Sequence, residues 1–420
     1  MKRKNRKILM ICPEAFRLGW MGATRRLFHL AYAFQELGFN VALLTGKMTN
    51  LPVEIEIDSQ FPGMVFRTQH TDAYPHIIDI SPAVRRAWRV FWKIKGAEYY
   101  ISRLSYGWAE KLDVNQVIAD LEGRFGTPNL IWGVCAGYLA GGTAADRMAK
   151  AIGVPWILEL QDPPWGCGLA EERKTISKEF KRLLNAASVQ VVVTESYRRK
   201  LLADFSINPK KLLTIYLTYD REPINNEKAF QDAKWRVIYA GSLSGGRSVA
   251  PLLYGLHKAL LLKPELSNYV SVEVAGKGFG LKEGKRLSKK LDLQHLVRFH
   301  GYVDRKEAEK LSSIADVLVV MQTPETSLYQ IPGKVFDCIA FGVPILGIMP
   351  QCEAATILQA SGLGFIHHSE DVDGIAETLI KLWTDWQSGH PSVQIDHDYV
   401  KQFSVESLTK KLYYVLEELL

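Results

Sequence analysis

A lysine and an aspartate stand three residues apart in the stretch 323–350, directly after Pro332 and Gly333. Proline suits the first turn of a helix, where an N–H group has no partner to lose, and residues three apart share a helix face. The free N–H groups of such a helix start attract anions. Lys334 can therefore bind a phosphate, and Asp337 can accept hydrogen bonds from sugar hydroxyls. A salt bridge between the two on a capped surface helix explains the same spacing equally well.

Two glycine-rich turns follow expected strands in the second half of the chain. The first contains Gly241, Ser242 and, after two more glycines, Arg247, and the second spans residues 276–280. Glycine lets the backbone approach a ligand closely, and in an open parallel sheet such turns face the ligand crevice. Neither turn matches the dinucleotide fingerprint G-x-G-x-x-G with an acidic residue about 20 positions later, and the P-loop pattern is absent.

The first half of the chain offers two further candidates. Gly22 lies in an expected loop, 18–23, which leads into a helix with Arg25 and Arg26 at its start. Asp162 follows a strand-like run and precedes two prolines. Residues just past the carboxyl end of a strand line the crevice of an open sheet. Turn chemistry for the glycine, surface charge for the arginines and an Asx-turn for the aspartate are the alternatives.

The elements that position these residues alternate between strand and helix in both halves. Apolar runs of strand length are followed by stretches with apolar residues at helical spacing, which indicates parallel sheets with flanking helices. We expect an α/β fold of two tandem doubly wound, Rossmann-like domains, covering 1–222 and 234–400, with a polar linker between them. The last helix, within 401–420, is expected to pack back on the N-terminal domain.

Composition and charge limit the class of protein. The chain has 420 residues, 47% of them hydrophobic, and a net charge of +7, which suggests acidic partners such as phosphates or anionic lipid. Its five cysteines are scattered without a C-x-x-C pair, so neither a disulfide framework nor a zinc site is expected. The basic N-terminus precedes an apolar stretch of strand length only, and no apolar run reaches about 18 residues. We therefore expect a cytoplasmic chain without a signal peptide or membrane span.

Residues 84–95 carry an amphipathic pattern of a different kind. Trp88 and Trp92 lie on one predicted helix face, and arginines and a lysine lie mainly on the opposite face. A basic face opposite tryptophans is typical of a helix that lies in a membrane interface. We expect this segment to hold the protein on the anionic inner face of the membrane, although an ordinary helix with buried tryptophans gives the same pattern.

Five motifs, in order, resemble those of a known enzyme family. They are AGSLSGGRS (240–248), VEVAGKG (272–278), VRFHGYV (297–303), ADVLVV (315–320) and IPGKVFDCIAFGVPIL (331–346). Together they resemble a two-domain GT-B glycosyltransferase of the large retaining group known as family 4, polysaccharide-assembly type, over nearly the whole chain. The resemblance implies an active site in the cleft between the two domains and an NDP-sugar as donor substrate. It implies no metal or other cofactor and no protein nucleophile, because the leaving phosphate is thought to assist the acceptor hydroxyl.

The resemblance also implies roles for the candidate residues. Arg247 and Lys334 are expected to hold the diphosphate, and Asp337 the ribose. Other groups expected to contact the nucleotide sugar are Gly22, Gly241, Ser242, Pro332 and Gly333, with Gly301, Tyr302 and Val303 bordering the base. Asp162 is expected on the acceptor side, where a glycan or lipid-linked glycan of surface polysaccharide assembly would bind. No nucleic-acid partner is expected.

Three positions depart from the family pattern. The group usually carries a glutamate pair, E-x7-E, but Tyr329 occupies the first position here and Asp337 the second, and Ser242 stands where an arginine is common. These departures leave two alternatives open. One is a non-catalytic GT-B-like protein that binds a nucleotide or organises an assembly complex. The other is an NDP-sugar 2-epimerase, which would need His300 and Asp162 to converge.

Overall fold

The computed structural model describes residues 6–13, 22–47, 58, 61, 63–71, 108–109, 111–136, 139–164, 170–219, 234–390 and 392–420. The predicted membrane-lying segment 84–95 falls outside these residues. The chain divides into two compact units. Unit 1 comprises Met1–Tyr216 and Val405–Leu420, and unit 2 comprises Leu217–Ser404.

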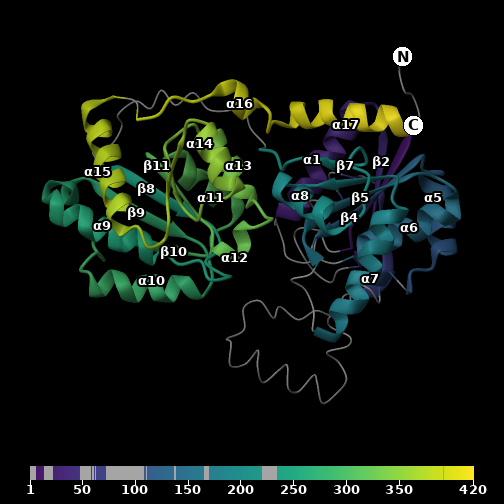
Figure 1. The fold of residues 1–420 in the computed structure, drawn as a ribbon, viewed down its shortest axis with the longest axis horizontal. Coiled ribbons are helices and arrows are strands. Elements are labelled where there is room, and N and C mark those ends of the chain that lie inside the picture. The colour runs from purple at the N-terminus through teal and green to yellow at the C-terminus, as the bar shows by residue number, and fades with distance from the viewer. Residues whose placement is uncertain are drawn as a thin grey trace. The chain divides into compact units, whose positions relative to one another are not determined.

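Unit 1 contains, in its described residues, a seven-stranded parallel sheet with the order β3-β2-β1-β4-β5-β6-β7 (Figure 1). The strands are β1 (Lys7–Ile11), β2 (Asn40–Lys47), β3 (Val65–Thr71), β4 (Leu130–Ala136), β5 (Trp156–Asp162), β6 (Val189–Val192) and β7 (Leu212–Thr214). The helices are α1 (Gly22–Glu36), α5 (Val114–Arg124), α6 (Ala140–Ile152), α7 (Ala170–Ala186), α8 (Glu195–Asp204) and α17 (Val405–Leu419).

The C-terminal helix α17 belongs to the core of unit 1. Its apolar residues Leu408, Leu412 and Leu416 are buried in the same cluster as Leu27 and Leu30 of α1. These leucines recur at four-residue spacing, so they form one apolar stripe along α17. Helices α1 and α17 therefore pack side by side, as Figure 1 shows.

Unit 2 repeats the plan with a six-stranded parallel sheet in its described residues, in the order β10-β9-β8-β11-β12-β13. The strands are β8 (Trp235–Ala240), β9 (Val270–Ala275), β10 (Val297–Gly301), β11 (Val317–Met321), β12 (Ile345–Ile348) and β13 (Gly364–His367). The helices are α9 (Ala250–Leu262), α10 (Phe279–Lys290), α11 (Arg305–Ser313), α12 (Pro324–Ser327), α13 (Gly333–Ala340), α14 (Glu353–Ala360), α15 (Val372–Ser388) and α16 (His397–Lys401). A 3₁₀ helix covers Pro264–Asn268.

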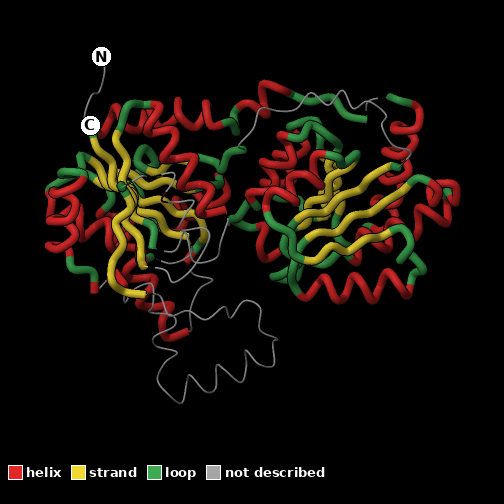
Figure 2. The backbone as a smooth tube through the Cα atoms, turned by 180° about the vertical axis from the view of Figure 1, so that it is seen from behind, coloured by secondary structure: helices red, strands yellow, loops and turns green. Residues whose placement is uncertain are grey.

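The expected α/β class with two doubly wound sheets is confirmed. In each unit the strands lie between layers of helices, drawn yellow and red in Figure 2. Strand order reverses direction between β1 and β4 in unit 1 and between β8 and β11 in unit 2. At such a switch point the connections leave toward opposite faces of the sheet, and the carboxyl ends of the two strands open a ligand crevice.

The sequence patterns missed one edge strand of each sheet and one helix start. Strands β3 and β13 lie at the edges. Every residue of β13 is partly exposed, so it lacks the continuous apolar run of a central strand. Helix α1 begins at Gly22, which was expected in the preceding loop. Among the described residues, none of the helices combines the length and apolarity needed to span a bilayer.

Candidate functional site

The candidate site lies at the carboxyl edge of the unit 2 sheet, where backbone hydrogen bonds join three strand-end turns. The N–H of Leu243 donates to the carbonyl of Lys277 at 2.8 Å, and the N–H of Gly276 donates to the carbonyl of Gly301 at 2.7 Å. These bonds fix the turns after β8, β9 and β10 relative to one another. A ligand in the crevice therefore meets a prearranged backbone.

Glycine is required where these turns touch. Gly276 has φ +151°, and a Cβ there would lie 1.8 Å from the carbonyl oxygen of Gly241. Gly278 has φ +130°, and a Cβ there would lie 2.5 Å from the carbonyl oxygen of Leu243. No side chain fits at either position without moving backbone, so the two turns pack closely only because both glycines are present.

Lys334, at the start of α13, projects an ammonium group against this packed edge. Its Nζ is buried, has no hydrogen-bond partner among the described residues and lies 4.0 Å from the centre of the Tyr239 ring. A Cβ on Gly241 would lie 2.8 Å from the same nitrogen, so the glycine leaves room for it. Lys334 forms no ion pair with Asp337 in the described structure, which rules out the salt-bridge alternative.

Arg247 provides a second buried cationic nitrogen in the turn after β8. Its Nε also lacks a hydrogen-bond partner among the described residues. Its carbonyl oxygen packs against Gly280, where a Cβ would lie 2.4 Å away, so the turn is held against the start of α10. Some buried side-chain nitrogen and oxygen atoms of the described residues have no hydrogen-bond partner, and Arg247 Nε and Lys334 Nζ are the cationic atoms among them. Buried charge without a partner is costly, so both atoms fit a site that an anion completes.

Tyr302 and Lys277 lie on the turns that follow β10 and β9, which backbone hydrogen bonds join to the turn after β8. The Tyr302 side chain is 71% exposed, and Lys277 Nζ lies 5.2 Å from the centre of its ring. Gly301, with φ +78°, makes the turn that presents Tyr302, and Val303 follows half-buried. An exposed ring of this kind can stack on a planar group. Lys277 was not among the predicted residues, although the motif VEVAGKG contains it.

A hydrogen bond within the loop between β11 and α13 involves Gln322, which was not among the predicted residues. Gln322 is buried, and its amide donates to the carbonyl of Gln330 at 2.7 Å. This bond spans the loop and sets the position of Pro332, the residue before the first turn of α13. Asp337 is half-buried one turn after Lys334, and Tyr329 is half-buried within the loop.

Ser242 forms hydrogen bonds that stabilise the turn after β8. Its Oγ accepts a hydrogen bond from the N–H of Ser244 at 3.3 Å, and its carbonyl accepts one from the Tyr239 hydroxyl at 2.8 Å. The residue is exposed at the same edge as Gly241. Because its side chain is short and neutral, it adds no charge to the site.

In unit 1 the candidates occupy the carboxyl edge of the other sheet. Asp162 is the last residue of β5 and is half-buried, and Gly22 is the first residue of α1. Arg26, one turn on, is not a surface charge. It is 1% exposed, and its Nε donates to Glu159 at 3.2 Å, so it cannot serve as a free phosphate ligand.

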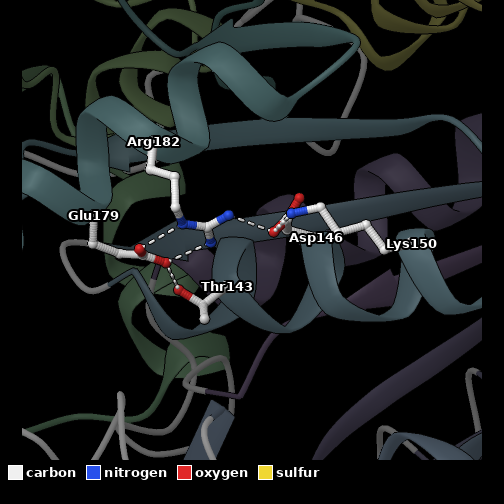
Figure 3. Close-up of polar contacts among 5 residues, drawn as sticks. All are labelled: Thr143, Asp146, Lys150, Glu179 and Arg182. Carbon is white, nitrogen blue, oxygen red and sulfur yellow. Dashed lines mark hydrogen bonds and ion pairs between the residues drawn. The ribbon is translucent and has the colours of Figure 1, made fainter.

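A second polar cluster ties α6 to α7 (Figure 3). The guanidinium of Arg182 bonds Glu179 at 2.7 Å and Asp146 at 2.6 Å, Thr143 donates to Glu179 at 2.8 Å, and Lys150 donates to Asp146 at 2.7 Å. Burial acts to raise the pKa of Glu179, but the hydrogen bonds from Arg182 and Thr143 outweigh it and the pKa lies below its usual range. The charges of this cluster are paired with one another, although Asp146 Oδ1 is buried without a hydrogen-bond partner among the described residues, so the cluster links the two helices.

Three other kinds of chemistry can be compared with the groups that the structure describes. Within the ranges that the structure describes, no group of three or more His, Cys, Asp or Glu side chains is placed to hold a metal ion. Cys338 lies on α13 near Lys334, but burial raises the pKa of its thiol to about 12. It therefore stays protonated and is a poor nucleophile. His300, the histidine of the epimerase alternative, bonds Glu273 at 2.5 Å.

Comparison with known proteins places this geometry in context. Residues 220–395 match the family model described as "Glycosyl transferases group 1". A comparison with curated proteins gave no match. The structure is similar to sucrose-phosphate synthase from Thermosynechococcus elongatus, with TM-score 0.65, 14% identity and 99% of each chain covered.

Two further solved structures share the fold over almost their whole length. Anabaena HepE in complex with UDP-glucose gives TM-score 0.64 at 15% identity, covering 98% of this chain and 100% of that chain. A putative UDP-N-acetylglucosamine 2-epimerase from Listeria monocytogenes gives TM-score 0.54 at 10% identity, covering 98% and 96%. The chain therefore has the GT-B fold. Because a synthase and an epimerase both show it, the fold alone does not decide the reaction.

Proposed function

We propose that this protein is a glycosyltransferase that moves a sugar from a nucleoside-diphosphate sugar to a glycan or lipid-linked acceptor. The observation that carries the proposal is the pair of buried cationic nitrogens, Arg247 Nε and Lys334 Nζ, which lack partners in the described structure. Both lie within residues 220–395, the part that matches the glycosyltransferase family model. A structural relative was solved with UDP-glucose, which supports a UDP-sugar as the donor.

In this proposal the two cations stabilise the leaving group. The bond between the anomeric carbon and the diphosphate oxygen breaks, and a bond from the acceptor oxygen to the anomeric carbon forms. Negative charge develops on the departing diphosphate, and fixed cations in a water-poor site lower the barrier most when they meet that charge. The proton of the acceptor hydroxyl passes to the departing phosphate, so no side-chain nucleophile is needed and the configuration is retained.

Neighbouring groups complete the donor site. The free N–H groups at the Pro332–Gly333 helix start add dipole stabilisation to the diphosphate. Asp337 accepts hydrogen bonds from the ribose, and Gly241 and Ser242 border the phosphates. Gly301, Tyr302 and Val303 surround the base. Unit 2 thus binds most of the donor, and N–H groups around Gly22 help to hold the diphosphate, whereas Asp162 of unit 1 contributes to acceptor binding. Transfer of this kind would serve surface polysaccharide assembly on the inner face of a membrane.

Nucleotide release separates this proposal from its alternatives. Purified protein is incubated with a panel of UDP- and GDP-sugars, and nucleoside diphosphate and the stereochemistry of the recovered sugar nucleotide are measured. Release of nucleoside diphosphate that depends on Lys334 and Arg247 supports a transferase. Binding without release would support the non-catalytic protein, and a changed configuration at C2 of intact sugar nucleotide would support the epimerase. If the protein neither binds a sugar nucleotide nor releases nucleoside diphosphate, the proposal is contradicted.

A further inference from the structure

Helix α10 carries a row of cations that the donor site does not use. Its twelve residues include five lysines or arginines and one carboxylate, Glu283. Gly280, Gly284, Leu287 and Ser288 are buried on one side. All five cations are exposed on the other side: Lys282, Lys285, Arg286, Lys289 and Lys290. Their i, i+3, i+4, i+7, i+8 spacing makes a single stripe about 12 Å long. We call it the α10 basic face.

The α10 basic face borders a groove at the edge strand β10. The groove has a volume of about 560 Å³, and Lys285, Lys289, His295 and Arg298 line it. Within the described part of the chain, none of these four side chains forms an ion pair. The groove therefore presents positive charge both along the helix and across the strand.

The nearby carboxylates are already engaged. Glu273, the acidic residue of the groove, meets His300 through one oxygen at 2.5 Å and Ser271 through the other at 3.0 Å. Glu283 accepts a hydrogen bond from Ser248 at 2.8 Å, and Asp292 accepts one from Gln294 at 3.0 Å. Among the described residues, none of these three carboxylates forms an ion pair with a cation of α10, so those cations are open to an external anion.

An exposed apolar pair lies at the same end of the sheet. Leu261 and Leu262 close helix α9 and are 69% and 55% exposed. Helices α9 and α10 pack together over the same core, and both run back along parallel strands, so both end at the edge where the strands begin. Apolar side chains beside a row of cations match an anionic bilayer, since lipid headgroups take the charge and the acyl boundary takes the leucines. A nucleic acid would have no use for the leucines.

We infer that the α10 basic face, with Arg298 of β10 and the α9 leucines, binds the surface of an anionic lipid bilayer. This surface belongs to unit 2 and does not include residues of the segment 84–95. It does not depend on the proposed transferase reaction. Membrane contact through α10 would bring the donor-binding unit to a lipid-linked acceptor.

Vesicle co-sedimentation tests this inference directly. The full chain is mixed with vesicles of phosphatidylcholine alone or of phosphatidylcholine with phosphatidylglycerol. We expect binding to the mixed vesicles that weakens as salt is raised. The paired change Lys285→Gln and Lys289→Gln should lower the partition coefficient about 30-fold. Each lysine near an anionic surface raises the partition coefficient by a factor of about five, and the two factors multiply. The matched control is Lys306→Gln with Lys310→Gln on α11, which should bind as the wild type does.

Several outcomes would overturn the inference. Wild-type binding by the α10 pair would place the membrane contact elsewhere, and equal binding to neutral vesicles would remove the electrostatic argument. Retention of an RNA oligonucleotide without vesicle binding would identify a nucleic-acid surface instead. Thermal melts verify that each variant is folded. Nucleoside diphosphate release measured without vesicles should be unchanged in the α10 pair, so a failure here and a failure of the transferase proposal are distinguishable.

Discussion

The ammonium nitrogen of Lys334 lies 4.0 Å from the centre of the Tyr239 ring and makes no hydrogen bond among the described residues. An aromatic face stabilises a cation without occupying its N–H groups. A carboxylate partner would neutralise the charge and compete with a ligand. The ring therefore holds Lys334 in a buried position while all of its donors stay available to an anion.

Replacing Lys334 should move stability and binding in opposite directions. In Lys334→Met the chain no longer buries an uncompensated ammonium, so the melting temperature without ligand should rise by a few degrees. Affinity for UDP should fall about 100-fold, since a charge-assisted contact to the diphosphate is lost. Differential scanning fluorimetry with and without UDP measures both effects. Tyr239→Phe is the comparison, because it retains the ring beneath the ammonium and removes the hydroxyl that donates to the Ser242 carbonyl, so it perturbs the turn without changing the lysine. A lower melting temperature with unchanged UDP affinity would contradict the site.

Two glycines of the site should respond differently to alanine. In Gly276→Ala the new Cβ meets the Gly241 carbonyl at 1.8 Å in a backbone region that disfavours side chains, so we expect a loss of about 3 kcal/mol or more in the free energy of unfolding. In Gly241→Ala the new Cβ meets the movable end of Lys334 at 2.8 Å. That variant should stay close to wild-type stability and bind UDP about 10-fold more weakly.

A glycine without neighbours provides the control for both variants. Gly123, in α5, has nothing within 4 Å of its added Cβ, so Gly123→Ala should leave UDP binding unchanged and should not destabilise the chain. Urea unfolding and UDP titration are measured on all three variants. Equal UDP affinity in Gly241→Ala and wild type would show that the ammonium position does not matter for binding.

The central strands of unit 2 could be predicted closely from sequence. The sequence has strand-like runs at 235–240, 270–275 and 317–321, and these coincide with β8, β9 and β11 at both ends. Buried parallel strands are read as apolar runs because helices cover both faces. The glycine turns after β8 and β9 could be placed for the same reason, since each follows directly from the end of its strand.

The sequence could not reveal contacts between side chains on different elements. Arg26 was predicted at a helix start, either beside a ligand or as a surface charge, yet Glu159 of β5 and the carbonyl of Tyr216 accept hydrogen bonds from it. The bond from Gln322 to Gln330 and the approach of Lys277 to the Tyr302 ring are also set by packing. Residue type and local period carry no information on which element lies opposite, so these pairs emerge only in three dimensions.

The α6–α7 cluster should make unit 1 sensitive to acid. The pKa of Glu179 is lower in the folded chain than in the unfolded chain, so its contribution is complete above about pH 4.3 and is lost as the pH falls through the folded pKa. Arg182→Gln should reduce this loss, which sets in as the pH falls below about 4.3. Because the Arg182 side chain is 40% exposed, screening limits the expected cost at pH 7 to about 1 kcal/mol. Thermal melts across this pH range compare the variant with wild type. An identical pH profile would show that the Arg182–Glu179 pair does not cause the acid sensitivity.

The pair formed by Arg26 and Glu159 should show strong coupling. Both side chains are fully buried, Trp132 donates to the second carboxylate oxygen at 2.8 Å, and Arg26 also donates to the Tyr216 carbonyl at 2.9 Å. Arg26→Met leaves a buried carboxylate without its cation and should cost about 3–5 kcal/mol. Glu159→Met leaves the arginine without its anion and should cost a similar amount.

The double change to methionine removes both charges and should therefore cost much less than the two single changes added together. Equilibrium unfolding in urea gives the coupling free energy from the four proteins of the cycle. If the losses in the free energy of unfolding of the two single variants simply add, Arg26 acts through the carbonyls of Ile215 and Tyr216 and not through Glu159. In that case Arg26→Lys, which keeps the charge but not the fork of donors, should be as damaging as Arg26→Met.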